Sequence, residues 1–275
     1  MRQITHPGPV ADTRADVLPC QAQPVRVTLR AGDTLTRAIA DGLATAGFSN
    51  GYLRLDGAAL APMHYVQPAP APGDGHAAWY SRTYVQPLAT IRHGGAHLGL
   101  RDGQPFVHCH AAWHDHGMGH VLCDDTLLRR DVTVQGWGLR GAGLVAQPDP
   151  ETLFTLFRPQ AQGGVAEAVA YLITLRPNQD IGRALLRIAR DLKITRARIE
   201  GIGSLVGTVF EQAPSLESYA TELLIVAGDL HSDEICLQVA SVGFDGTSQH
   251  GVLRVGKNAI CVTAEMLMIA VPDPE

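Results

Sequence analysis

Residues 105–123 read PFVHCHAAWHDHGMGHVLC, and this stretch decides how we expect the first part of the chain to fold. VHCHA has the composition of a β-strand, HDHGMG that of a turn, and GHVLC that of a returning strand. Residues i and i+2 of a strand point to one face, so His108 and His110 should project side by side, roughly 6.5 Å apart. The returning strand would bring His120 to the same face. The stretch therefore predicts a β-hairpin with three histidines on one side.

Three imidazoles that leave one coordination position open are typical of a catalytic zinc site, whereas structural zinc sites are closed by four protein ligands. We therefore interpret His108, His110 and His120 as ligands of zinc or another divalent transition metal. The simpler alternative is a surface hairpin that is rich in histidine. Cys123 would be a fourth ligand only in a different strand register.

The turn of this hairpin carries further polar residues. His114 and Asp115 are our candidate catalytic residues, as a general base and as the partner that orients a ligand histidine. The alternative is that they are solvated turn residues. Cys109 alternates with the two ligands along the strand, so we expect it in the core.

Composition indicates an ordinary globular protein of 275 residues, with 45% hydrophobic and 18% charged residues. A net charge of −5 gives no overall basic field to hold nucleic acid. The N-terminus lacks the apolar segment of a signal peptide, and no apolar run is long enough to span a membrane. The five cysteines are scattered without CxxC spacing, which fits reduced thiols. We expect a cytoplasmic protein.

The order of predicted elements repeats at a displacement of 146 residues: a strand, a capped helix and a strand at 24–55, and again at 170–205. Towards the ends of the two units, DVTV at 131–134 matches CVTA at 261–264. We interpret this as an internal duplication of two α+β units. The predicted divisions are an N-terminal arm (1–23), a first domain (24–147), a linker (148–167) and a second domain (168–275).

Several short motifs in the two units resemble the plants-and-prokaryotes-conserved (PPC, or PCC) domain. In the second unit these are GIGSL at 201–205, LIVAGDL at 224–230 and CVTAE at 261–265. In the first unit they are the HxH strand, GHVL at 119–122 and the strand that ends at Val134. The resemblance covers residues 24–144 and 168–271 and implies a tandem PPC protein.

The resemblance implies, for each domain, an antiparallel sheet packed around a helix, and a homotrimeric assembly. It also places metal ligands at His108, His110 and His120. The second unit has Gln238 and Ala240 where the first has its HxH pair, so we expect it to be a degenerate copy that supports the assembly. The family's plant members bind DNA through a basic AT-hook, which this sequence lacks.

The first unit carries extra residues between about 62 and 98, rich in aromatic, Arg and His residues. We predict that they form a wall of a substrate pocket in which Arg92 and His93 contact the substrate. The alternative is an ordinary surface loop. Together these features predict a metal-dependent enzyme, a hydrolase or lyase acting on a small carboxylate-bearing metabolite. The alternatives are a DNA-binding or regulatory protein without catalytic activity and a trimeric scaffold tied by metal.

Overall fold

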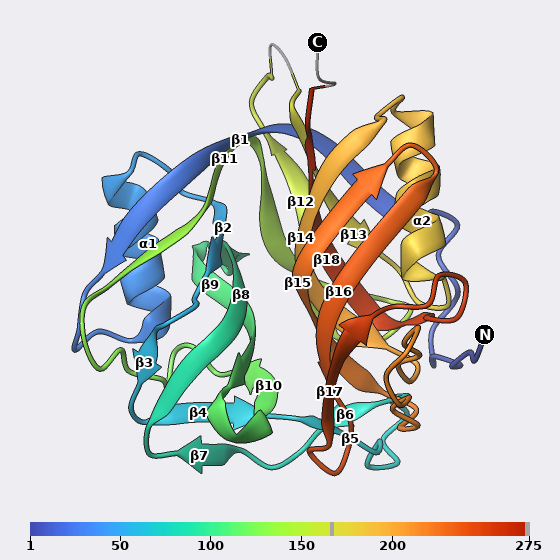
Figure 1. The fold of residues 1–275 in the computed structure, drawn as a ribbon, viewed down its shortest axis with the longest axis horizontal. Helices are drawn as coiled ribbons and strands as arrows, with labels where there is room; N and C mark the ends of the chain where they lie inside the picture. Colours follow the sequence, from blue (N-terminus) through green and yellow to red (C-terminus); the bar gives the residue numbers. More distant parts are fainter. Residues whose placement is uncertain (166–167, 273–275) are drawn as a thin grey trace.

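The computed structural model describes residues 1–165 and 168–272, with the side chain of Asp115 excepted, and it is dominated by antiparallel sheet (Figure 1). Strands make up 54% of the structure and helical residues 9%. The expected α+β class is therefore wrong. Two helices of 11 residues each are too short to form a layer of their own, so long curled strands bury most of the core.

In the main sheet, six strands of the first half lie in the order β1-β11-β2-β8-β9-β10, and the short strands β4 and β7 extend this order beyond β10. The elements of this half are β1 (Ala15–Leu29), α1 (Leu35–Thr45), β2 (Gly51–Arg54), β8 (Ala89–Arg101), β9 (Gln104–Trp113), the 3-10 turn η1 (His114–His116), β10 (Met118–Val121) and β11 (Val132–Pro148). Short strands lie between β2 and β8: β3 (Ala59–Leu60), β4 (Met63–Val66), β5 (Pro68–Ala69), β6 (Trp79–Tyr80) and β7 (Tyr84–Gln86).

The second half follows the order β13-β18-β14-β15-β16-β17, which matches the first half strand for strand. Its elements are β13 (Ala170–Leu175), α2 (Ile181–Asp191), β14 (Arg196–Leu205), β15 (Thr221–His231), β16 (Glu234–Val242), β17 (Ser248–Val252) and β18 (Ile260–Ala270). β1 joins the halves, because residues 15–20 pair with β13 and residues 21–29 pair with β11. Figure 1 shows β1 in dark blue, crossing from one half to the other.

Two segments expected to be irregular are strands. Residues 15–23 of the predicted arm begin β1, and Pro19 is tolerated there because this part of β1 pairs with β13 on one side only. β12 (Thr155–Gln162) lies inside the predicted linker and pairs with β11. Each segment contains a proline, and the buried and exposed residues of β12 do not alternate, so the sequence did not indicate strands there.

Each helix begins at the cap that the sequence predicts and covers the core of its own half. The Thr34 hydroxyl accepts a hydrogen bond from the backbone N–H of Arg37, and the Asp180 carboxylate accepts one from Arg183. In both helices the apolar stripe is buried: Leu35, Ile39 and Leu43 in α1, and Ile181, Leu185 and Ile188 in α2. No helix in the described part of the chain is long and apolar enough to cross a membrane.

The two halves face each other across a buried interface. Ala112 and Met118 of the first half pack against Ile202 and Leu224 of the second. Nearby, the guanidinium of Arg54 donates to the buried Glu200 carboxylate at 2.7 Å, and its other nitrogen donates to a backbone carbonyl of β15. This interface holds β9 and β10 against β14, β15 and β18.

Candidate functional site at the interface of the two halves

The three histidines of the predicted hairpin converge as the sequence indicates. His108 and His110 lie two residues apart on β9, and His120 on β10 pairs directly with His110. One ring nitrogen from each lies within 4.8 Å of the others. Such spacing suits three imidazoles that bind one ion.

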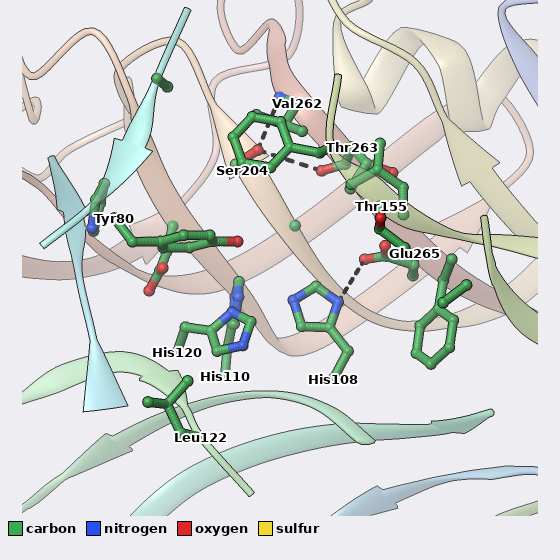
Figure 2. A pocket seen from close by; sticks show the side chains of 18 of the residues that line it. Tyr80, His108, His110, His120, Leu122, Thr155, Ser204, Val262, Thr263 and Glu265 are labelled. Carbon is green, nitrogen blue, oxygen red and sulfur yellow. Dashed lines mark hydrogen bonds and ion pairs between the residues drawn. The ribbon is translucent and has the colours of Figure 1, made fainter. Parts of the chain in front are cut away.

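Two of these rings are oriented by groups from the second half of the chain. The Nδ1 of His108 lies 3.2 Å from Oε2 of Glu265 on β18 (Figure 2). The Nδ1–H of His110 donates to the backbone carbonyl of Leu223 on β15 at 2.8 Å. In both rings Nε2 is left to bind a metal, and partners on the opposite nitrogen are usual for metal-binding histidines.

His120 presents the third nitrogen, and its Nδ1 is buried without a hydrogen-bond partner among the described residues. Burial, followed by the neighbouring His108, lowers the pKa of His110 to about 3, and burial also lowers the pKa of His120 well below its ordinary value. Both rings are therefore neutral at pH 7, which is the state that binds metal. The donor set and the unpartnered nitrogen fit a divalent transition metal.

The histidines form one wall of a cavity of about 510 Å³ that lies between the halves. The second half provides further polar groups of the lining: Glu222 on β15, and Glu265 on β18 and Ser204 on β14, of which the last two are labelled in Figure 2. The Ser204 hydroxyl is held by a backbone N–H of β18, which donates to it at 2.9 Å. The site is thus built from both halves.

Glu222 is the buried polar group that the protein fold leaves most unsatisfied here. Its side chain is 4% exposed, and neither carboxylate oxygen has a hydrogen-bond partner in the described structure. Burial raises the pKa of Glu222 well above its ordinary value. An uncompensated buried carboxyl is costly, and such groups are concentrated at functional sites.

Tyr80 reaches the same cavity from β6. Its ring is partly exposed, and Figure 2 shows its hydroxyl directed into the cavity above the histidines. Burial, and then the charge of Glu222, raises the pKa of the Tyr80 hydroxyl above its usual range. The hydroxyl therefore remains protonated and able to donate a hydrogen bond.

The other residues predicted for the site lie elsewhere. Arg92 and His114 line a separate cavity of about 220 Å³, together with His116 and His250. His93 points towards Asp56, with 3.9 Å between ring nitrogen and carboxylate oxygen. The side chain of Asp115 lies outside the described residues. The structure does not bring Arg92, His93 or His114 to the three histidines.

Both cysteines of the hairpin are buried. Cys109 belongs to the core, as predicted, and the Cys123 thiol donates to the backbone carbonyl of Val121. Among the described residues the three histidines are the one group of His, Cys, Asp and Glu spaced to hold a metal, so Cys123 is not part of it.

Sequence reasoning did not select Glu222 or Arg101, which line the large cavity, whereas Tyr80 belongs to the extra residues 62–98 that were predicted to form a pocket wall. Glu222 carried a usable signal, because it precedes the apolar run LLIVA and a carboxylate beside such a run needs a partner. The placement of Tyr80 and Arg101 depends on how the halves pack, which no local pattern reveals.

No family model matches the chain, and no curated protein matches it. Solved structures that resemble part of it include a metal-containing protein from Archaeoglobus fulgidus, 17% identical, with a TM-score of 0.38 over 50% of this chain and 96% of that one. A plant- and prokaryote-conserved (PPC) protein from Pyrococcus horikoshii is 14% identical, with a TM-score of 0.35 over 54% and 96%. A candidate DNA-binding protein from Ralstonia eutropha is 13% identical, with a TM-score of 0.35 over 51% and 95%.

Proposed function

We propose that the protein is a metal-dependent enzyme, a hydrolase or lyase, that acts on a small carboxylate-bearing metabolite. The observation that carries this proposal is the convergence of three histidines, two of them with strongly lowered pKa values, on the wall of a cavity of about 510 Å³. Cavities of this size are typical of small-molecule sites. Zinc or another divalent transition metal fits the three nitrogen ligands.

A metal bound there supplies Lewis-acid chemistry, in which a carbonyl oxygen is polarised or a water molecule becomes more acidic. The protein's own groups orient the ligands and handle protons. Glu265 and the Leu223 carbonyl fix the tautomers of His108 and His110. The Glu222 carboxyl faces the same space, where it can give a proton to a substrate atom or take one from it.

Arg101 is the cation best placed to hold a substrate carboxylate. It is the one arginine among the described residues that line the cavity, and its guanidinium stacks on the Phe106 ring at 5.3 Å. A guanidinium can bind a carboxylate through two parallel hydrogen bonds. Asp124 and Asp125 also line the cavity, and they are exposed like Arg101, so solvent screens the charges of all three.

The matching strand orders support an internal duplication, and we place the two domains at residues 24–147 and 168–275. The homotrimer implied by the resemblance remains a prediction, and sedimentation equilibrium would test it.

Two measurements test the enzyme proposal. Elemental analysis of protein purified without chelators should find one transition metal per chain, and His108→Ala and His110→Ala should each remove most of it. Metal-loaded protein screened against small carboxylate esters, amides and hydroxy acids should show turnover that Glu222→Gln abolishes. Arg101→Ala should raise KM, whereas Arg130→Ala, an exposed arginine away from the cavity, should not.

Absence of stoichiometric metal would overturn the proposal. Salt-dependent binding of duplex DNA in the micromolar range at physiological ionic strength would favour the alternative, a DNA-binding or regulatory protein without catalysis. The net charge of −5 and a cavity sized for a metabolite favour the enzyme.

A further inference from the structure

Three aromatic rings gather at one side of the cavity, away from the polar wall. His76 and Trp79 lie 4.4 Å apart between ring centroids, and Phe154 lies 5.0 Å from the first and 5.5 Å from the second. All three line the cavity that contains the metal-type histidines. We call His76, Trp79 and Phe154 the aromatic cluster.

The aromatic cluster is assembled from two segments far apart in the sequence. His76 and Trp79 belong to the segment 68–80, which includes β5 and β6, and Phe154 precedes β12. Two extra segments of the chain thus meet at one side of the cavity.

The segment 68–80 is fixed against the second half. The backbone N–H of Ala71 donates to the Tyr219 hydroxyl at 3.0 Å. Ala78 is buried in an apolar cluster with Val206 and Ala220. These contacts hold Trp79 in place although its side chain is 36% exposed. A large aromatic ring that is held in place yet partly uncovered has surface to offer a ligand.

Tyr80 connects the aromatic cluster to the histidines. Its ring lies 5.5 Å from His120 on one side and 6.3 Å from Phe154 on the other. A bound molecule of modest size could therefore reach the three histidines with one end and the aromatic cluster with the other.

We propose that the aromatic cluster is a binding subsite for a planar, aromatic group, so that the ligand of this cavity is an aryl-bearing carboxylate. Aromatic side chains prefer edge-to-face and offset contacts with a further ring, which favour a planar group over a saturated one of equal size. The identification of this ligand as a substrate rests on the proposed function. The binding preference does not.

The test compares 3-phenylpropanoate with 3-cyclohexylpropanoate, which carry the same charge and nearly the same apolar bulk. Isothermal titration calorimetry should show that the wild-type protein binds the phenyl compound about 3- to 10-fold more tightly. Phe154→Leu keeps an apolar side chain but removes the ring, and it should abolish most of this preference. Val85→Ala, exposed on β7 and outside the cavity, is the matched control and should leave the preference unchanged.

Equal or tighter binding of the cyclohexyl compound would overturn the subsite, as would an undiminished preference in folded Phe154→Leu protein. Trp79→Leu provides a second variant if Phe154→Leu does not fold. The measurement is repeated in His110→Ala, whose metal site is damaged. If His110→Ala protein keeps the preference for the phenyl compound, the subsite is supported even when the wild type lacks metal or turnover. If metal-loaded wild-type protein lacks the preference, the subsite is refuted and the proposed function is not.

Discussion

Replacing Glu265 by Gln tests whether the second half of the chain tunes the metal site of the first. The Glu265 side chain is 1% exposed, and its Oε2 lies 3.2 Å from Nδ1 of His108. A carboxylate in this position fixes the ring tautomer and makes the metal-facing nitrogen more basic. Gln has nearly the same shape, so the substitution removes the charge and leaves the packing.

The expected loss of metal affinity depends on which interactions the Gln side chain keeps. Loss of a carboxylate that orients a metal-binding histidine typically weakens metal binding by about 10- to 100-fold. A Gln side chain still places a polar oxygen near Nδ1 of His108, so we expect the lower end, about 10-fold, equivalent to about 1.4 kcal/mol. Removing a charge from a buried position should not destabilise the metal-free fold.

The assay titrates metal-free protein with Zn²⁺ in competition with a chromophoric chelator. Glu234→Gln, exposed on β16, is the control and should bind zinc as the wild type does. Unchanged affinity in folded Glu265→Gln protein would refute the role assigned to this carboxylate. A loss much beyond 100-fold would show that Glu265 is itself a ligand and not an orienting partner.

Four further predictions follow from the same geometry. His110→Ala should reduce the metal from one per chain to a small fraction, while His231→Ala leaves it unchanged; a wild-type value near two by elemental analysis would reveal a second site. Burial lowers the pKa of His97 to about 4 in the folded protein, from 6.5 in the unfolded chain. As the pH falls, the unfolded chain is therefore protonated at His97 before the folded protein is. Stability in urea should therefore fall as pH drops from about 6.5 towards 4, and His97→Asn should flatten that part of the profile. Arg54→Met removes one of the two guanidinium partners of the buried Glu200 carboxylate and leaves Arg198 at 2.8 Å, so it should lower the free energy of unfolding by about 2 kcal/mol, against less than about 0.5 kcal/mol for the exposed Arg37→Met. The dissociation constant for duplex DNA should be no lower than about 10⁻⁴ M at physiological salt, and fluorescence anisotropy measures it. A constant in the micromolar range would contradict this prediction.

Local chemistry made much of the structure predictable. Both helices begin at residues whose side chains cap them, and the i, i+2 spacing of His108 and His110 set their common face. The hairpin that the sequence predicts is present, with β9 and β10 paired through His110 and His120. These features depend on interactions between residues that are close in sequence or joined by a short turn.

The fold class and the lining of the large cavity could not be predicted, because both depend on packing between residues that are far apart in the sequence. The strand β12 was hidden because Pro159 and the glycines at 163 and 164 resemble a linker, and because its buried and exposed residues do not alternate, although it pairs with β11. Arg92 was assigned to the substrate because it precedes the hairpin, but the bulge in β8 between Ile91 and His93 interrupts the register there, and Arg92 lies at the smaller cavity. One irregular residue in a strand changes which face its neighbours occupy.

The second half of the chain lacks the HxH pair, and from the sequence alone it was expected only to support the assembly. In the structure its strands supply Glu222, Glu265 and the carbonyl that orients His110. An imidazole site needs carboxylates and carbonyls behind its ligands, and the first half does not provide them from its own strands. Separating the halves would therefore leave three histidines on one hairpin without the groups that orient them. Each half therefore contributes a different part of one site: the first half the three histidines, and the second half the buried carboxylates and the carbonyl that orients His110.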